Sequence, residues 1–363
     1  MACTVIKLGS SVVVGDDGAV HAEVVGAICD QATGLFHAGG EVVIVTSGAI
    51  ARGMQVMDLA QRPRVIDELQ AASAVGQGKL FRVYDELLRE RGIVSAQVLL
   101  TFFDVGHRGH YLNARQTLGR LLDWRVIPVV NENDTTATEE ISFGDNDFLA
   151  AQIAILVGAD RLVLLTNQDG LHTADPRSDP SAELVREVDD VAELARYSIG
   201  QAPSALGSGG MRSKVVAAEM ATAAGIPTTI CSGLSEGALS RALGGEPEGT
   251  RFAPQAQRHS SFDLWLKYAK PARGGVVVDA GAARALREEG ASLLPVGIVD
   301  VDGAFGEGDA IEIRDSGGVL AKGISSYAAD DVRRAMGRQT AAVRELLPRA
   351  ADEVVHRDYL VLV

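Results

Sequence analysis

Short apolar runs alternate with helical patterns through the first two-thirds of the chain, and this alternation restricts the fold more than any other feature. Each run is rich in Val, Ile or Leu and apolar on both faces, which is typical of strands inside a parallel sheet. The runs are Val5–Ile6, Val42–Val45, Ile127–Val130 and Leu162–Leu165. Between them apolar residues recur at helix spacing, as at Leu80, Val83 and Leu87 before Arg91 and Gly92. The pattern predicts an α/β fold with a mostly parallel sheet covered by helices.

A smaller domain is expected after the turn-rich segment Gly244–Thr250. Gly-rich turns then separate short strand-like runs, namely Val276–Val278, Val296–Val301, Ile311–Ile313 and Val319–Leu320. This is typical of a small, mainly β module. The chain of 363 residues is long enough for two or three domains. We predict one domain over 1–255, a linker over 256–274 and the β module over 275–355.

Charge and composition exclude several classes of protein. A net charge of -14 does not suit a protein that coats nucleic acid or an anionic membrane non-specifically. The N-terminus shows no signal peptide, and no apolar stretch approaches the roughly 20 residues of a membrane span. Three cysteines without metal-ligand spacing indicate reduced thiols. We therefore expect a cytoplasmic protein without a membrane partner.

Polar residues follow each of the four predicted strands. In an open parallel sheet, ligands bind beyond the carboxyl ends of the strands. The segments there are Lys7–Ser11, Thr46–Ala49, Asn131–Asp134 and Thr166–Gly170. Turns favour such residues in any protein, so one segment alone carries little weight. Four of them, with a lysine included, favour a polar ligand site at one edge of the sheet.

Two further segments are candidates for ligand binding. In Ser208–Lys214, two glycines lead into a helix-like run, and the lysine falls in its first turn, an arrangement that suits a phosphate. A solvated lysine on a loop is the alternative. Gly144–Asp147 precedes the run Phe148–Val157, and its carboxylates suit a metal, an amino group, a lysine or a helix cap. Walker A and Rossmann glycine motifs are absent from the sequence.

Several motifs, in this order along the chain, resemble the glutamate 5-kinase family of the amino acid kinase superfamily. They are Val5–Ser11, Val43–Ile50, Ala74–Gln77, Val129–Asp134, Gly144–Asp147, Gly170–Arg177 and Gly209–Lys214. The segments Val276–Ala282 and Val355–Asp358 resemble the PUA domain that bacterial members carry. The resemblance implies an amino acid kinase-like αβα sandwich followed by a small PUA-like domain.

The resemblance also implies a reaction, the phosphorylation of the γ-carboxylate of L-glutamate by ATP with Mg²⁺. This is the first step of proline biosynthesis, and the resemblance further implies feedback inhibition by proline and a homo-oligomer, a dimer or a tetramer. A glutamate side chain, with an ordinary pKa of about 4.3, is ionised at pH 7, so the nucleophile needs no general base. Catalysis then depends on positioning and on stabilising negative charge.

Matching positions imply roles for individual residues. The implied catalytic residues are Lys7, Lys214 and Asp147. The implied glutamate-binding residues are Ser47, Asp134, Asp145 and Asn146. The implied nucleotide-binding residues are Lys7, Thr166, Asn167, Ser208, Gly209, Gly210, Met211, Arg212, Ser213 and Lys214. The chain departs from the family at Asn167, where Asp is usual, at His172, where Tyr is usual, and at Ser208, where Thr is usual. Asn167 removes a charge and leaves the nucleotide preference open.

Two alternatives stay open from the residues. A related kinase would act on another acid, on carbamate or on UMP, but Asp134 and the run Gly144–Asp147 favour a free amino acid, because carboxylates suit an ammonium group. RNA binding through the PUA-like module is the other alternative. Residues 260–363 hold 13 basic and 16 acidic side chains, a net charge of -3, which lacks the basic surface expected for RNA.

Overall fold

The computed structural model describes residues 2–15, 17–101, 104, 108–136, 146–196, 210–255, 263, 266–267, 272–347 and 351–363. The chain divides into two compact units, Met1–Arg258 and His259–Val363. The division falls inside the segment 256–274 that the sequence suggests as a linker.

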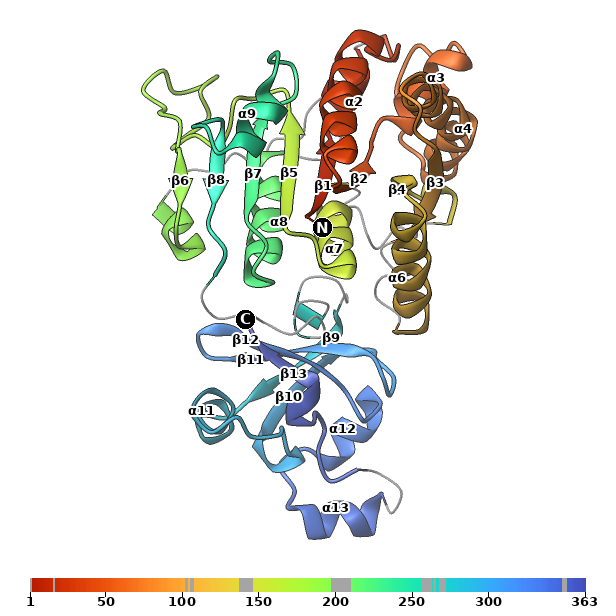
Figure 1. The fold of residues 1–363 in the computed structure, drawn as a ribbon. Coiled ribbons are helices and arrows are strands. Elements are labelled where there is room, and N and C mark those ends of the chain that lie inside the picture. The colour runs from red at the N-terminus through yellow and green to blue at the C-terminus, as the bar shows by residue number, and fades with distance from the viewer. Residues whose placement is uncertain are drawn as a thin grey trace. The chain divides into compact units, whose positions relative to one another are not determined.

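The first unit is built on an eight-stranded sheet in the described part of the chain (Figure 1). Its order is β3-β4-β2-β1-β5-β7-β8-β6, and every neighbouring pair is parallel except β7 and β8. The strands are β1 (Cys3–Leu8), β2 (Glu41–Val45), β3 (Ser95–Leu100), β4 (Ile127–Glu132), β5 (Arg161–Thr166), β6 (Glu187–Val188), β7 (Thr228–Ser232) and β8 (Thr250–Phe252). The four runs predicted as strands are the adjacent central strands β4, β2, β1 and β5. The mostly parallel sheet is confirmed.

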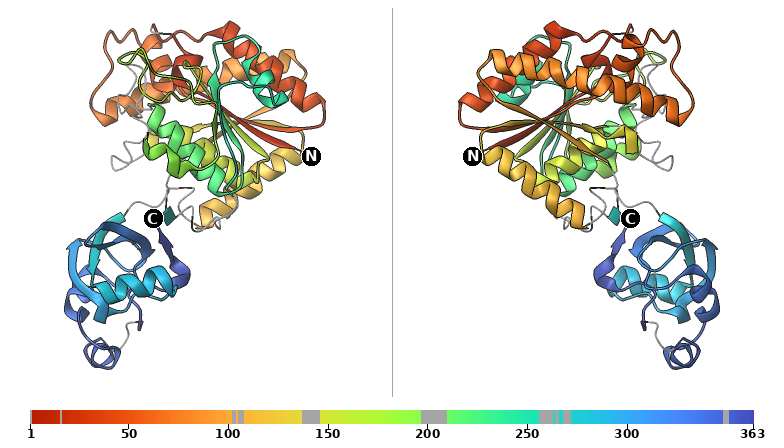
Figure 2. Two further views of the ribbon diagram at one scale, coloured as in Figure 1. Left: turned by 90° about the vertical axis from the view of Figure 1, so that its left-hand side faces the viewer. Right: turned by 90° about the vertical axis from the view of Figure 1, so that its right-hand side faces the viewer.

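Helices cover both faces of this sheet, as the edge-on views of Figure 2 show. Helices α2, α3, α4 and α9 lie on one face, and α6, α7 and α8 lie on the other. Among the described residues of this unit, α-helices are α1 (Ser10–Val13), α2 (Ala22–His37), α3 (Ala49–Val56), α4 (Ile66–Glu90), α6 (Arg108–Asp123), α7 (Asn146–Val157), α8 (Met211–Ala223) and α9 (Ala238–Gly244). Short 3-10 helices are η1 (Asp134–Thr136) and η3 (Val191–Arg196). The layers form the expected αβα sandwich.

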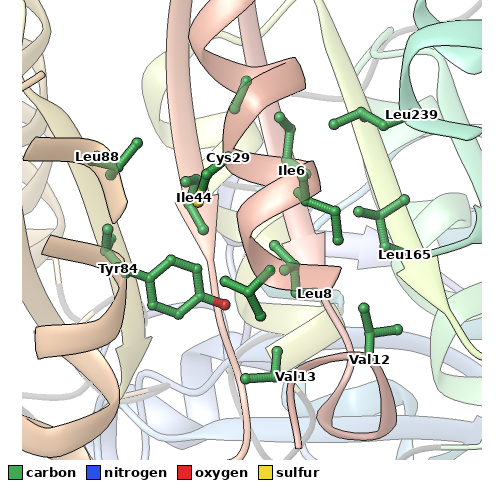
Figure 3. Close-up of a cluster of buried hydrophobic side chains, with 14 of the residues drawn as sticks. Ile6, Leu8, Val12, Val13, Cys29, Ile44, Tyr84, Leu88, Leu165 and Leu239 are labelled. Atoms are coloured by element: carbon green, nitrogen blue, oxygen red, sulfur yellow. The ribbon is translucent and has the colours of Figure 1, made fainter. Parts of the chain in front are cut away.

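The core of the first unit explains which strand residues face the site. Ile6 and Leu8 of β1 pack with Ile44 of β2 and Leu165 of β5 under α2, α4 and α9 (Figure 3). Successive side chains of a strand point to opposite faces of the sheet. Lys7 therefore points to the other face, toward α7. Because Ile6 and Leu8 occupy the face under α2, α4 and α9, the buried Lys7 between them is directed to the opposite face.

The second unit holds a five-stranded sheet in its described residues, with the order β10-β9-β11-β12-β13. Its elements are β9 (Ala272–Val278), α11 (Ala280–Glu288), η5 (Pro295–Gly297), β10 (Ile298–Gly303), β11 (Ala310–Asp315), β12 (Gly318–Ile324), α12 (Ala329–Ala335), α13 (Thr340–Leu346), η6 (Arg357–Tyr359) and β13 (Leu360–Leu362). The β9–β11 pair is parallel and the other pairs are antiparallel. The sheet extends beyond 275–355 at both ends, because β9 begins at Ala272 and β13 pairs with β12. The unit has its own apolar core around Val276, Ile313 and Val332.

Two further expectations concern membranes and thiols. None of the helices in the described ranges is both long and apolar enough to cross a membrane. Cys3, Cys29 and Cys231 are buried and form no disulfide. Burial raises the pKa of each thiol to about 12, so these side chains are protonated packing residues at neutral pH.

Candidate active site

The carboxyl ends of the central strands lie level at one edge of the sheet. Parallel pairing places Lys7 beside Val45 of β2 and Leu8 beside Leu165 of β5. The polar segments that follow these strands therefore meet, as the sequence predicts. The strands extend slightly further than expected, so that Lys7, Asn131 and Thr166 belong to the strands themselves.

Two lysines bind one carboxylate at this edge. Asp147, in the first turn of α7, is fully buried. The Nζ of Lys7 lies 2.5 Å from its Oδ1, and the Nζ of Lys214 lies 2.9 Å from its Oδ2. The hydroxyl of Ser213 also donates to Oδ2, at 3.1 Å. Strand β1, helix α7 and helix α8 thus meet through a single carboxylate.

The side chains of Lys7, Lys214 and Asp147 together carry a formal charge of +1 in a buried place. Burial by itself raises the pKa of Asp147, but Lys214 and Lys7 outweigh it and hold the pKa well below its ordinary range. The carboxylate is therefore ionised at neutral pH. Lys7 and Lys214 are only 2% and 6% exposed. Two buried ammonium groups around one carboxylate suit a further anion, such as a phosphoryl group.

The N-terminus of α8 lies next to the cluster. Helix α8 begins at Met211 after Gly210, and Lys214 is the last residue of its first turn. The N–H groups of a first helical turn and the positive end of the helix dipole favour an anion there. Thr166, at the end of β5, is buried and donates to the side-chain oxygen of Asn167 at 3.4 Å. Ser208 and Gly209 lie outside the described residues.

Asn146 joins the strand ends on the other side of the site. Its amide nitrogen donates to three acceptors, the carbonyl of Thr46 at 2.6 Å, the hydroxyl of Ser47 at 3.1 Å and the Oδ1 of Asn131 at 2.7 Å. Its own Oδ1 is buried and has no hydrogen-bond partner among the described residues. Leaving a buried acceptor unpaired costs about 1–3 kcal/mol. The unpaired oxygen favours a ligand that donates a hydrogen bond. Asp145 lies outside the described residues.

Asp134 is a second carboxylate at the same edge, in the 3-10 turn after β4. The hydroxyl of Ser73 on α4 donates to its Oδ2 at 2.6 Å. Burial raises the pKa of Asp134, against the lowering effects of the Ser73 hydrogen bond and of the Arg62 charge. A partly buried carboxylate with a raised pKa is suited to bind a cation from a ligand.

Five residues that support the site received no individual role from the sequence, although Thr46 and Asn131 lie in the polar segments expected at this edge. Thr46 accepts or donates a 2.8 Å hydrogen bond with Tyr84 of α4, whose ring belongs to the core in Figure 3. Asn131 donates to the Oε1 of Gln77 at 2.7 Å. Asn131 and Gln77 lie in sequence motifs, which is the signal that could have found them. Ser73 and Tyr84 have no comparable signal, because they look like ordinary helix residues.

Comparisons with known proteins identify the family of this chain. The model of the amino acid kinase family matches residues 2–232, and that of the PUA domain matches residues 274–347. A glutamate 5-kinase from a Polaromonas species is 46% identical over 99% of this chain and 95% of its own. One from Meiothermus ruber is 45% identical with the same coverage. Among solved structures, a UMP kinase from Bacillus anthracis covers 70% of this chain and 96% of its own at 17% identity and a TM-score of 0.48, a likeness that assigns no function. On the full-length matches, the chain belongs to the glutamate 5-kinase family, with an amino acid kinase domain followed by a PUA domain.

Proposed function

We propose that this protein transfers the γ-phosphoryl group of ATP to the γ-carboxylate of L-glutamate and so forms glutamyl 5-phosphate, the first intermediate of proline biosynthesis. The observation that carries the proposal is the pair of buried lysines on Asp147, beside the N-terminus of α8. The relatives that match over nearly the whole chain bear the name of this activity.

The charge of the cluster fits the electrostatic problem of this reaction. The attacking carboxylate is already ionised at pH 7, so no general base has to remove a proton. It must instead approach a polyanion, and the transferring phosphoryl group spreads charge over its oxygens. Lys7 and Lys214 are catalytic in this proposal, because their ammonium groups flank that charge. Asp147 holds both lysines in place and is the third catalytic residue.

The amino acid end of glutamate is assigned to the other half of the site. Asp134 would pair with the α-ammonium group, and the unpaired Oδ1 of Asn146 would accept one of its hydrogen bonds. Ser47, which hydrogen-bonds to Asn146, lines the same region. Asp145 completes the set by its place in the sequence. A ligand with an ammonium group would satisfy both acceptors at once, the partly buried Asp134 and the buried Asn146, and neither carbamate nor UMP carries such a group.

The nucleotide is assigned to the side of α8 and β5. Thr166, Asn167 and the segment from Ser208 to Lys214 form this subsite, with backbone N–H groups at Gly210–Ser213 directed at phosphates. Mg²⁺ enters as part of the substrate Mg-ATP. Both oxygens of Asp147 are already bonded to lysines, and the described residues hold no cluster of three potential metal ligands. The phosphates of ATP and water are oxygen ligands that suit this ion.

Two properties follow only from the family resemblance. We propose that proline inhibits this enzyme by feedback. We also propose that the enzyme is cytoplasmic and forms a homo-oligomer, either a dimer or a tetramer. Initial rates at fixed glutamate with increasing proline test the inhibition. Light scattering of the purified protein gives the oligomer number.

A hydroxylamine trap tests the reaction itself. The purified protein is incubated with Mg-ATP, hydroxylamine and L-glutamate, and glutamyl hydroxamate is measured, with aspartate and N-acetylglutamate in parallel. A signal with glutamate alone identifies both the acyl phosphate and its acid. Folded protein that gives no hydroxamate with any of the three acids contradicts the proposal. A salt-dependent shift of structured RNA would then move the function to the PUA domain.

A further inference from the structure

Helix α4 carries the motif Ala74–Gln77, which has no role in the proposed reaction. The helix crosses α3 at backbone contact. A Cβ atom on Gly76 would lie 2.0 Å from the carbonyl oxygen of Ala49, and one on Gly53 would lie 1.7 Å from that of Ala72. Only glycine permits this approach. Helix α3 directly follows Ser47 and Gly48. The crossing therefore holds α4 against the site.

The side chain of Gln77 acts on the site through Asn131. Its Oε1 accepts the hydrogen bond from the Nδ2 of Asn131 at 2.7 Å. This bond leaves the Oδ1 of Asn131 to accept from the Nδ2 of Asn146, also at 2.7 Å. With its nitrogen engaged in this way, Asn146 presents its buried Oδ1, which has no partner among the described residues. If the side-chain amide of Asn131 were rotated by 180°, its NH₂ group would face the NH₂ group of Asn146. Asn146 would then lose the hydrogen bond that orients it.

The side chain of Ser73 acts on Asp134. It is 2% exposed, and its hydroxyl donates to the Oδ2 of Asp134 at 2.6 Å. Ser73 and Gln77 are four residues apart, so they lie on the same face of α4, one turn from each other. One face of one helix thus contacts both acceptors assigned to the ammonium group, Asp134 directly and Asn146 through Asn131.

We propose that Ser73 and Gln77 are positioning residues for the amino acid substrate: Gln77 orients the Oδ1 of Asn146 through Asn131, and Ser73 orients the carboxylate of Asp134. This inference rests on the proposed function and deepens it. It identifies the face of α4 as the part of the fold that sets affinity for the amino acid end of glutamate. Neither residue is expected to affect the nucleotide.

The first test replaces Gln77 with leucine and measures steady-state rates for both substrates. Gln77→Leu is expected to raise the KM for glutamate about three- to tenfold, the effect of one hydrogen bond between neutral groups. The KM for ATP is expected to stay within about twofold. Gln116→Leu, an exposed glutamine on α6, is the matched control and is expected to change neither KM. An unchanged KM for glutamate in Gln77→Leu overturns the role of Gln77. If this variant does not fold, Gln77→Asn, which withdraws the amide by one methylene, serves for the same measurement.

The second test replaces Ser73 with alanine. Because Ser73 donates to a charged acceptor, its loss is expected to raise the KM for glutamate about ten- to 100-fold. Ser73→Ala removes one hydroxyl group and adds no bulk, so the packing of α4 is preserved. An equal rise in the KM for ATP, or a fall in kcat with no change in either KM, would contradict a positioning role.

Double-mutant cycles separate positioning from a general loss of structure. In an Asn146→Ala background, Gln77→Leu is expected to have almost no further effect on the KM for glutamate. In an Asp134→Ala background, the same is expected of Ser73→Ala. In the crossed pairs, the fold-changes in the KM for glutamate of the two single variants are expected to multiply. These pairs are Gln77→Leu with Asp134→Ala and Ser73→Ala with Asn146→Ala. If the fold-changes also multiply when Gln77→Leu is combined with Asn146→Ala and Ser73→Ala with Asp134→Ala, the two helix residues do not act through the acceptors assigned to them.

The failure of this inference differs from the failure of the proposed function. Wild-type protein is first tested for glutamyl hydroxamate and for a rise in its unfolding temperature with glutamate. Wild-type protein that shows neither overturns the proposed function and this inference together. If the wild-type protein shows both signals, and the variants keep its KM for glutamate and its rise in unfolding temperature, only the positioning role is overturned.

Discussion

Lys7 and Lys214 share one counterion, since their ammonium groups bind the two oxygens of Asp147 at 2.5 and 2.9 Å. One lysine is the penultimate residue of the central strand β1, and the other closes the first turn of α8. The shared carboxylate holds two like charges close together in a buried place, which would otherwise be costly. The cluster is therefore arranged for an incoming anion.

Replacing Lys214 with alanine tests the phosphoryl site. Lys214→Ala is expected to lower kcat about 10²- to 10³-fold, the usual cost of losing one group that stabilises charge in a transition state. The KM for glutamate is expected to stay near its wild-type value, because the ammonium end binds elsewhere. Lys79→Ala, an exposed lysine on α4, is the control and should keep full activity. Wild-type kcat in Lys214→Ala would remove Lys214 from the phosphoryl site.

Replacing Asp147 with asparagine tests how much its carboxylate offsets the free-energy cost of burying two lysines. The pKa of Asp147 is lowered in the folded state, so its charge stabilises the fold above the ordinary carboxyl pKa, and this stability is lost as the pH falls. Asp147→Asn removes the anion that both buried ammonium groups bind. The free energy of unfolding at pH 7 is expected to fall by about 3–5 kcal/mol. Denaturant titration measures it, with the exposed Asp123→Asn as control. Equal stability in both variants would show that the pair needs no counterion.

Replacing Asp134 with asparagine is expected to have the opposite effect on stability. Burial raises the pKa of Asp134, so its ionisation costs stability at pH 7, and the cost disappears once the pH falls below the ordinary carboxyl pKa. Asp134→Asn keeps an acceptor for Ser73 but removes the charge. Its unfolding temperature is expected to exceed that of wild type at pH 7 and to approach it below about pH 4. Its KM for glutamate is expected to rise. A lower unfolding temperature at pH 7, or an unchanged KM, would contradict this account.

The sequence predicts the centre of the fold better than its margins. Strands β4, β2, β1 and β5 are buried on both faces, and their composition reveals them. The edge strand β3, Ser95–Leu100, alternates half-buried and exposed residues, and β6 and β8 have only two and three residues. These strands form because an adjacent strand pairs with them, and the composition of the segment itself does not predict such pairing. Helices α11, α12 and α13 of the second unit were also missed, because they are short and are held by packing on the core of that unit.

For the site, the sequence predicts which residues carry charge but not how they are held. Lys7, Lys214 and Asp147 appear as candidates from their places at strand and helix ends, and the structure brings them together. The hydrogen bonds from Ser73 and Gln77 depend on the closeness of α3 and α4, which two glycines allow. A glycine in a helix indicates only that another backbone can approach closely at that position. Which helix approaches it is known only from the fold.

A truncated protein tests whether the first unit is sufficient for phosphoryl transfer. The described site residues, from Lys7 to Lys214, all lie within Met1–Arg258. The first unit has an apolar core around β1, β2 and β5, and the second has a separate core of its own. Residues 1–258 are therefore expected to fold and to form glutamyl hydroxamate from Mg-ATP and glutamate, whereas residues 259–363 alone are expected to form none. A truncated protein with a cooperative unfolding transition but no hydroxamate would show that the PUA domain is required for the reaction.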